Sequence, residues 1–391
     1  MNVMKTNFDN LIDRRGSGCF KYDALGLIYG RDDLISLWVA DMDFAIAPAI
    51  REALQNKLDH GILGYNYNPP EFYEAVADWV GKHYGIKAER EWMLLTPGIV
   101  TAINLAVLQL TQPGDGVLIQ TPVYRPFFSA VLNHGRKLLT NPLINTDGYY
   151  TIDFDDFERK IAQAKLFILC SPHNPVGRIW SEDELRKMGS LCRKYRVPII
   201  SDEIHADLVY EGNGAISIAS LEDFADLTLC CCSPSKSFNI AGLSTAITIV
   251  KNPELREPLR KMIWDLHLYL GNTFGIEAVI AAYSNGEGWL RELLTYLRGN
   301  RDFMHDFIST RLPMIRMAKP ESTYLAWLDF RGLGLPDEDI SDLLVNKARL
   351  ALDPGHKFGV EGTGFQRLNF GCSHSVLKEA LQRLEQVLEE I

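Results

Sequence analysis

The sequence lacks long hydrophobic runs and has fewer basic than acidic residues, 40 Lys and Arg against 50 Asp and Glu. No stretch of about 18 uncharged apolar residues occurs in its 391 positions, so we expect no membrane-spanning segment. The first fifteen residues, MNVMKTNFDNLIDRR, have no apolar core, so we expect no signal peptide. A formal net charge of −10 at pH 7 without a basic stripe argues against a nucleic-acid-binding protein.

Cysteines are few and are badly placed for cross-links. The seven cysteines lack C-x-x-C spacing, and residues 230–232 are three consecutive cysteines. This pattern is typical of reduced thiols packed in a core rather than of disulfides or a zinc site. We therefore expect a cytoplasmic protein.

Common phosphate- and metal-binding motifs are missing as well. No G-x-x-x-x-G-K-[ST] loop occurs, and the glycines of FGVEGTGF (358–365) have the wrong spacing for a dinucleotide loop. Cys372 and His374 lack partners for a metal site, so we expect none. We interpret His173 as a solvated loop residue.

Short apolar runs alternate with helical patterns between about residues 97 and 250. The runs that predict strands are GVLIQTP (116–122), KLFILCSP (165–172), VPIISDE (197–203), LTLCCCSP (227–234) and STAITIV (244–250). Continuous apolar strands separated by helices predict an α/β fold with a mainly parallel sheet covered on both faces. The ligand site of such a sheet lies beyond the carboxyl ends of its strands. That rule points to Tyr124, Asn174, Asp202 and Lys236.

A Gly- and Asn-rich break at YSNGEGW (283–289) separates this region from a long amphipathic helical pattern. The remaining sequence predicts a strand, a helix, a strand and a final helix, the first three at 323–330, around 338–349 and at 365–370. We therefore expect three parts. These are an N-terminal segment (1–44) that packs on the small domain, a large domain (45–285) and a small α+β domain (286–391).

Lys236 stands directly behind an apolar run, among uncharged neighbours. A lone lysine in a serine-rich turn is ordinarily a solvated surface residue. A lysine that forms a Schiff base with a carbonyl cofactor instead needs a partly desolvated amine, because its pKa must fall before the neutral nucleophile is available. The hydroxyls of Ser233 and Ser235 are candidates to donate to a phosphate.

Three further positions allow both a structural and a chemical interpretation. Asp202, in IISDEIH, is either a helix cap or the carboxylate that a pyridine nitrogen requires. Asn174, in CSPHNPVG, is either a turn residue or an amide donor. The backbone N–H groups of Gly98, Ile99 and Val100 open a helix and could bind an anion, as any helix start could.

Order and spacing favour the chemical interpretation. Asn174, Asp202 and Lys236 follow one another at intervals of 28 and 34 residues, each at the end of a consecutive predicted strand. With these motifs the chain resembles, over essentially its whole length, the aspartate-aminotransferase superfamily (class I/II) of pyridoxal 5′-phosphate (PLP) enzymes. The resemblance implies fold type I, with a mixed, mainly parallel seven-stranded sheet in the large domain, a smaller α+β domain and a homodimer.

The same resemblance implies roles for individual residues. Lys236 would bind the cofactor covalently, Asp202 would pair with its pyridine nitrogen, and Asn174 would contact the ring O3′ and line the substrate site. Tyr124, in TPVYRPF, would stack on the ring. Arg367, in QRLNFG, would bind the α-carboxylate of an amino-acid substrate.

Two positions depart from the superfamily pattern. The tyrosine that usually follows the aspartate by three residues is His205 here, which we place against the cofactor. The phosphate-binding arginine usually found eight residues after the lysine is Ser244. The groups left for the phosphate are Ser233, Ser235, the helix start at 98–100 and, from the neighbouring subunit, Tyr65 in GYNYNPP.

These departures and three further stretches resemble the cystathionine β-lyase (C–S lyase) group that includes the MalY and PatB proteins. The stretches are FDNLIDRRGSGCFKYD (8–23), LWVADMDF (37–44) and DEIHADLVY (202–210). The second passes the substrate site in that group, so we expect Ala40 and Asp41 to line it, and we interpret Asp41 and Asp43 as turn caps rather than a metal pair. The resemblance implies β-elimination of a thiol from cystathionine, cysteine or S-substituted cysteines to give pyruvate and ammonia.

Two other functions stay open on the residues alone. Without a leaving group at Cβ, the same residues would support transamination, so a PLP-dependent aminotransferase of class I/II is the alternative. A non-catalytic binding or regulatory protein would be expected to lose the lysine or the aspartate, and both are present.

Overall fold

The computed structural model describes residues 6–212 and 214–390. Its largest layer is a seven-stranded sheet in the order β2-β10-β9-β8-β7-β3-β4. The strands are β2 (Met93–Thr96), β3 (Gly116–Thr121), β4 (Lys137–Pro142), β7 (Ala164–Cys170), β8 (Ile199–Asp202), β9 (Thr228–Cys232) and β10 (Ala246–Val250). β10 runs antiparallel to both of its neighbours, whereas the other pairings are parallel. The prediction of a mixed, mainly parallel seven-stranded sheet is confirmed.

The apolar runs identified the five inner strands and missed the two edge strands. β2 has four residues, all of them buried, and was not recognised as a run. β4 mixes buried with exposed positions because one side of an edge strand lacks a neighbour.

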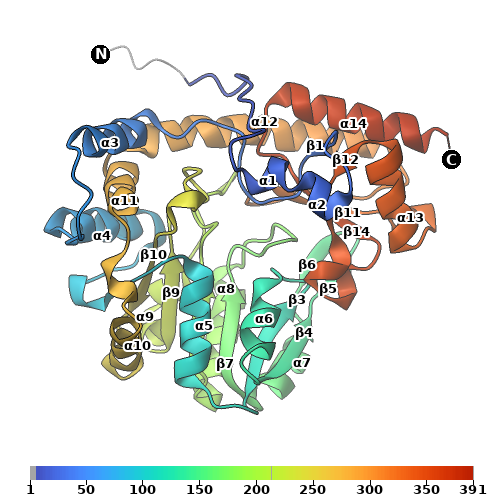
Figure 1. The fold of residues 1–391 in the computed structure, drawn as a ribbon. Helices are drawn as coiled ribbons and strands as arrows, with labels where there is room; N and C mark the ends of the chain where they lie inside the picture. The colour runs from blue at the N-terminus through green and yellow to red at the C-terminus, as the bar shows by residue number, and fades with distance from the viewer. Residues whose placement is uncertain (1–5, 213, 391) are drawn as a thin grey trace.

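Helices cover both faces of the sheet (Figure 1), which explains why the inner strands are apolar throughout. Val117 and Ile119 pack into the hydrophobic cluster on one face, and Leu118 between them packs into the cluster on the other. The helices of the large domain are α3 (Pro48–Asp59), α4 (Pro70–Tyr84), α5 (Ile99–Leu110), α6 (Pro126–Leu132), α7 (Phe154–Ile161), α8 (Glu182–Tyr195), α9 (Glu222–Ala225), α10 (Pro253–Asp265) and α11 (Thr273–Asn285). A hairpin of β5 (Ile144–Thr146) and β6 (Tyr149–Thr151) lies outside the main sheet.

The C-terminal part is built on a three-stranded antiparallel sheet in the order β11-β14-β13. Its elements are α12 (Glu287–Arg311), β11 (Leu325–Asp329), α13 (Asp337–Asp342), β12 (Leu350–Ala351), β13 (Asp353–Pro354), β14 (Phe365–Asn369) and α14 (His374–Leu388). The helix expected around 338–349 is shorter as an α-helix, because the chain continues from α13 as a π-helical turn over Leu343–Lys347.

The N-terminal segment lies beside this C-terminal part at the top of Figure 1. It contains α1 (Phe20–Asp23), α2 (Leu25–Tyr29) and β1 (Ile35–Ser36), and β1 pairs in parallel with β12. Among the described residues no helix is both long enough and apolar enough to cross a membrane.

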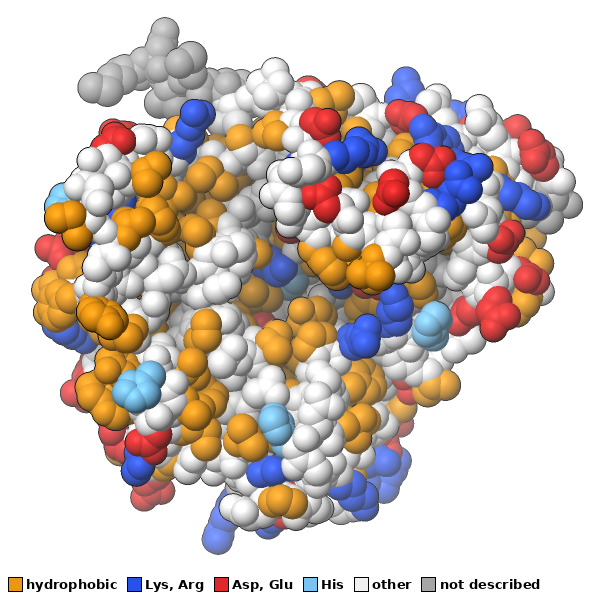
Figure 2. All heavy atoms as spheres, viewed as in Figure 1, with side chains coloured by type: hydrophobic (Ala, Val, Ile, Leu, Met, Phe, Trp, Pro, Cys, Tyr) orange, Lys and Arg blue, Asp and Glu red, His pale blue; other side chains and the backbone are white. Residues whose placement is uncertain are grey.

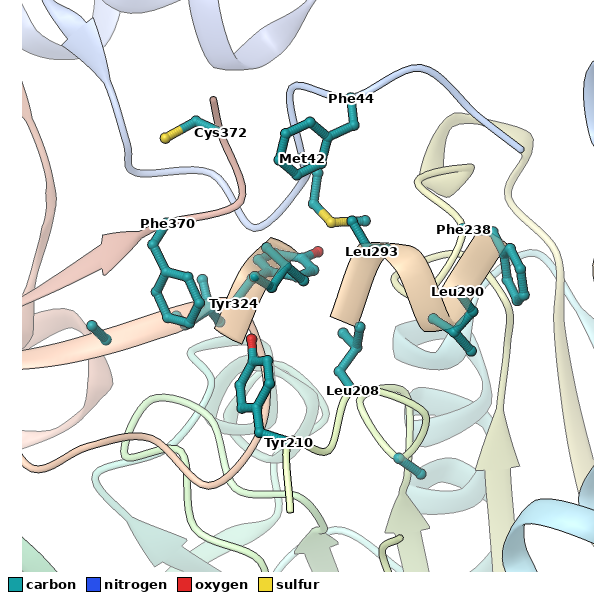
Figure 3. Close-up of a cluster of buried hydrophobic side chains, with 14 of the residues drawn as sticks. Met42, Phe44, Leu208, Tyr210, Phe238, Leu290, Leu293, Tyr324, Phe370 and Cys372 are labelled. Carbon is teal, nitrogen blue, oxygen red and sulfur yellow. The ribbon is translucent and has the colours of Figure 1, made fainter. Parts of the chain in front are cut away.

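One buried cluster is shared by all three parts of the chain (Figure 3). Met42 comes from the N-terminal segment, Leu208 and Tyr210 from the loop after β8, Leu293 from α12, and Phe370 from the position directly after β14. The N-terminal segment, the region of the seven-stranded sheet and the C-terminal part are therefore joined by apolar packing.

Leu293 is the position at which we test this shared core. Its side chain is 0% exposed, so Leu293→Ala removes buried methyl groups and leaves a cavity, and we expect a loss of about 2–5 kcal/mol of unfolding free energy. Leu27→Ala is the matched control, because Leu27 is 84% exposed and should change stability by less than about 0.5 kcal/mol. Urea unfolding followed by fluorescence measures both, and equal midpoints for the two variants would contradict the shared core.

Candidate active site

A cavity of about 260 Å³ lies beyond the carboxyl ends of β3, β7, β8 and β9. Its walls include ten of the residues expected from the sequence, namely Ala40, Gly98, Ile99, Val100, Tyr124, Asn174, Asp202, His205, Ser235 and Lys236. Figure 2 shows the face of the molecule hollowed near its centre, with basic side chains in and beside the hollow. Parallel strands bring these residues together because their carboxyl ends share one edge of the sheet.

Lys236 lies in the turn that follows β9 and reaches into the cavity. Its Nζ donates a hydrogen bond to the backbone oxygen of Ala40 at 2.6 Å. Burial lowers the pKa of Lys236 to about 8; the charges of Asp41 and Asp202 oppose this shift and that of Arg367 adds to it. At pH 7 roughly a tenth of an amine with this pKa is neutral and nucleophilic, far more than for an ordinary lysine.

Asp202 closes β8 at the edge of the cavity and is buried. The backbone N–H of Ile204 donates to its Oδ1 at 3.2 Å. Burial raises the pKa of Asp202 to about 6, against the lowering effects of that hydrogen bond and of Lys236. A buried carboxylate with so little compensation favours a cationic partner, such as a protonated ring nitrogen.

Two histidines near the cavity are buried. Burial lowers the pKa of His205 to about 3, with Lys236 and Arg367 adding to the effect, so the ring is neutral. Among the described residues its Nδ1 has no hydrogen-bond partner.

The interpretation of His173 as a solvated residue is wrong. It is 0% exposed, its Nε2–H donates to the backbone oxygen of Pro122 at 2.8 Å, and burial lowers its pKa to about 4. The ring lies edge-on to that of Trp180, with their centroids 5.4 Å apart, a contact that the sequence did not reveal.

Arg367 links the small domain to the cavity wall. Its Nη1 donates to Oδ1 of Asn174 at 3.1 Å, and its Nη2 donates to Oδ2 of Asp353 and to the backbone oxygen of Trp38, both at 2.9 Å. Its Nε is buried without a partner among the described residues. Arg367 is therefore fixed beside the cavity through Asn174, although it is not itself among the residues that line the cavity.

The groups expected to bind phosphate are only partly gathered. The N-terminus of α5 opens onto the cavity; Gly98 has φ +106°, and the place where its Cβ would stand is open space. Ser235 and Ser244 also line the cavity. Ser233 does not, since its Oγ donates to the backbone oxygen of Thr245 at 2.7 Å and accepts from the N–H of Ser235 at 3.1 Å.

Tyr124 and Tyr65 lie in very different surroundings. Tyr124 lines the cavity, and burial raises the pKa of its hydroxyl, with a further contribution from Asp202. Tyr65 is 96% exposed and does not line this cavity. Any role of Tyr65 in a cofactor site would therefore concern another subunit.

The expectation that Asp41 lines the cavity is wrong, because Ala40 is the one residue of WVADMDF in the cavity wall. Asp41 and Asp43 instead accept hydrogen bonds from Arg14 at 2.8 and 2.7 Å. Within the described ranges no group of three or more His, Cys, Asp or Glu residues could hold a metal ion.

Sequence reasoning missed several residues that hold the site. Asp353 pairs with Arg367, and Tyr324 donates to the oxygen of Ala40 at 2.9 Å. Both stand in or beside strands of the small domain, and nothing in the local sequence marks them. Thr245 also lines the cavity. The sequence could have suggested it, because it directly follows Ser244, the position where the superfamily usually has its phosphate-binding arginine.

The donor set fits a phosphorylated aromatic aldehyde with a basic ring nitrogen. It offers an amine of lowered pKa, a buried carboxylate that lacks a cation, a helix N-terminus beside hydroxyls, and an aromatic side chain. The unpartnered Nδ1 of His205, which lines the cavity, indicates that a polar group of a ligand belongs here.

The comparisons with known proteins agree with this site. A family model described as aminotransferase class I and II matches residues 32–384. The chain is 43% identical to cystathionine beta-lyase PatB of Bacillus subtilis (strain 168), over 98% of this chain and 100% of that protein. It is 34% identical to protein MalY of Escherichia coli (strain K12), over 97% of each. The PLP-bound C-S lyase from Staphylococcus hominis has the same fold, with a TM-score of 0.92 and 35% identity over 99% of both chains. The chain belongs to the class I and II aminotransferase family.

Proposed function

We propose that this protein is a PLP-dependent C–S β-lyase of the cystathionine β-lyase type. It eliminates a thiol from cystathionine, cysteine or an S-substituted cysteine and releases pyruvate and ammonia. The observation that best supports this proposal is that Lys236, Asp202 and Asn174 line the same cavity. The chain is also 43% identical, over 98% of its length, to a protein named cystathionine beta-lyase. We place it in the cytoplasm, in keeping with its seven free cysteines.

The cavity offers a partner for each part of PLP. Lys236 would hold the aldehyde carbon, Asp202 would pair with the pyridine nitrogen and Tyr124 would stack on the ring, and all three line the cavity. The N–H groups at the start of α5 and the hydroxyl of Ser235 would hold the phosphate. When bound, PLP withdraws electrons from the substrate α-carbon and so makes its α-proton acidic.

The residues of the chain do the remaining work. Arg367 and Asn174 bind and orient the substrate α-carboxylate. The Nζ of Lys236, once free, removes the α-proton, a task suited to an amine whose pKa burial lowers to about 8. The bond between Cβ and sulfur then breaks, its electron pair leaves with the sulfur, and the thiolate takes up a proton. Water converts the remaining three carbons to pyruvate and ammonia.

The protein is proposed to work as a homodimer. The segment between α3 and α4 exposes Ile62 (70%), Tyr65 (96%) and Tyr67 (71%), which is unusual for large apolar side chains. A second copy would cover this segment and receive the hydroxyl of Tyr65 at its phosphate. This contact would replace in part the arginine that Ser244 cannot supply.

Turnover of L-cystathionine without an added keto acid separates a lyase from a transaminase. The purified holoenzyme should release pyruvate and a free thiol in equal amounts. Lys236→Ala should abolish both, because it removes the base and the cofactor attachment. Turnover that requires a keto acid would instead identify an aminotransferase.

Borohydride reduction followed by peptide mapping should place the cofactor on Lys236, and a label on another lysine would contradict the site.

Arg367→Lys tests the carboxylate-binding role. Lysine cannot reproduce the planar guanidinium fork, so kcat/KM for L-cystathionine should fall about 100-fold, mainly through KM. Arg31→Lys is the control, since Arg31 makes a similar two-pronged contact with Asp33 near the surface, at 2.8 Å through both nitrogens. A fall confined to kcat would argue against carboxylate binding by Arg367.

Tyr65→Phe removes only the hydroxyl that the dimer proposal uses. Loss of one hydrogen bond to a charged phosphate should weaken PLP binding about tenfold, measured by equilibrium titration of the cofactor. Tyr67→Phe, at a neighbouring exposed tyrosine, should leave the affinity unchanged. Sedimentation should show a dimer for all three proteins, and a monomeric wild-type protein would refute the shared site.

A further inference from the structure

The backbone oxygen of Ala40 fixes the position of the lysine amine. It accepts hydrogen bonds from Nζ of Lys236 at 2.6 Å and from the hydroxyl of Tyr324 at 2.9 Å. Ala40 itself lines the cavity. Any displacement of this peptide would therefore move the amine relative to Asp202 and to the substrate site.

The peptides on both sides of Ala40 are held by asparagines. Nδ2 of Asn369 donates to the oxygens of Val39 and Asp41, both at 2.6 Å. Asn239 donates to the oxygens of Met42 and Phe44, both at 2.8 Å, and accepts from the N–H of Met42 at 2.9 Å. These side chains come from β14 and from the Lys236 turn, so the segment is fastened to both domains.

The outer side of the segment is held by charges, which we call the N-terminal ion cluster: Arg14, Lys21, Tyr22, Asp41 and Asp43. Arg14 pairs with Asp41 at 2.8 Å and with Asp43 at 2.7 Å. Lys21 donates to Asp43 at 2.9 Å and to the backbone oxygen of Asp41 at 3.1 Å. The hydroxyl of Tyr22 donates to Asp43 at 3.0 Å.

Lys21 is the unusual member, because its side chain is 0% exposed. A lysine is rarely buried completely, and burying an ion pair is an inefficient way to stabilise a fold, since desolvation offsets much of the attraction. What a buried and fully bonded charge provides is a fixed geometry. The backbone that this cluster fixes is the one that carries the Ala40 oxygen.

We propose that the N-terminal ion cluster positions the catalytic amine of Lys236 through the backbone oxygen of Ala40. This inference rests on the proposed function, in which the freed amine removes the substrate α-proton. Arg14, Lys21, Asp41 and Asp43 are positioning residues: in this structure they contact Lys236 through the peptide rather than directly. The two stretches FDNLIDRRGSGCFKYD and LWVADMDF would share this role, because together they supply all residues of the cluster.

The charge of Asp41 also acts on the amine. The charged and polar groups around Lys236 are Asp41, which acts through its charge, Tyr324 on the oxygen of Ala40, Asp202 and the neutral His205 after β8, and Arg367 on β14. Asp41 and Asp202 raise the pKa of Lys236, whereas burial and Arg367 lower it. Removing the charge of Asp41 should therefore lower that pKa further and leave a weaker base.

Two variants and one control test the positioning role. Lys21→Met keeps the length of the side chain and removes its charge. Asp41→Asn keeps the shape of the side chain and retains an oxygen that accepts from Arg14. Lys82→Met is the control, because Lys82 makes an exposed ion pair with Glu287 at 2.7 Å outside the cavity.

The first readout is turnover of L-cystathionine by the holoenzymes, well below their unfolding temperatures. Lys21→Met should lower kcat about tenfold and change KM less than about twofold, because a misplaced base slows the chemical step more than it weakens binding. The control should match the wild type. A Lys21→Met enzyme with a lowered unfolding temperature and an unchanged kcat would show a purely structural cluster and overturn the proposal.

The second readout needs no activity. Competitive acetylation of the cofactor-free, full-length protein, with Lys236 followed by mass spectrometry, reports the protonation of that amine against pH. Asp41→Asn should move the labelling midpoint of Lys236 about one pH unit lower, and the control should leave it in place. An unmoved midpoint would overturn the inference even if the lyase is active, whereas a moved midpoint in a protein without lyase activity would refute only the proposed function.

Discussion

The structure depends on the burial of an amine at the carboxyl edge of a parallel sheet. Lysine normally remains in water, and removing it from water lowers the pKa of Lys236 to about 8. The same low-polarity setting raises the pKa of Asp202 to about 6. Burial therefore makes the neutral amine available near neutral pH and leaves the carboxylate in need of a cationic partner, and the sheet supplies that burial.

The sheet alone does not bury this site; the C-terminal part and the N-terminal segment cover it. Arg367 reaches from the small domain to Asn174 of the large domain, and Asp353 balances its charge. The N-terminal segment supplies the Ala40 oxygen to Lys236. The apolar cluster in Figure 3 joins all three parts of the chain, so the geometry of the site is supported by the packing of the whole protein.

Catalysis of this type relies on position more than on strong individual contacts. The contacts around Ala40 are ordinary hydrogen bonds, but they come from both domains and from the N-terminal segment. A carbonyl held in this way gives the amine one defined position when it is free. Groups fixed before the reaction need little reorganisation during it, which is a main source of rate enhancement in enzymes.

The sequence by itself determined the inner strands of the sheet and the residues at their ends, because strands buried on both faces are apolar throughout and parallel strands end at one edge. It therefore yielded Asn174, Asp202 and Lys236 as neighbours. Tertiary structure alone decided the edge strands, the burial of His173, the internal hydrogen bonds of Ser233, and the partners Asp353 and Tyr324. These depend on contacts between segments far apart in the chain, and no local pattern of residues encodes such a contact.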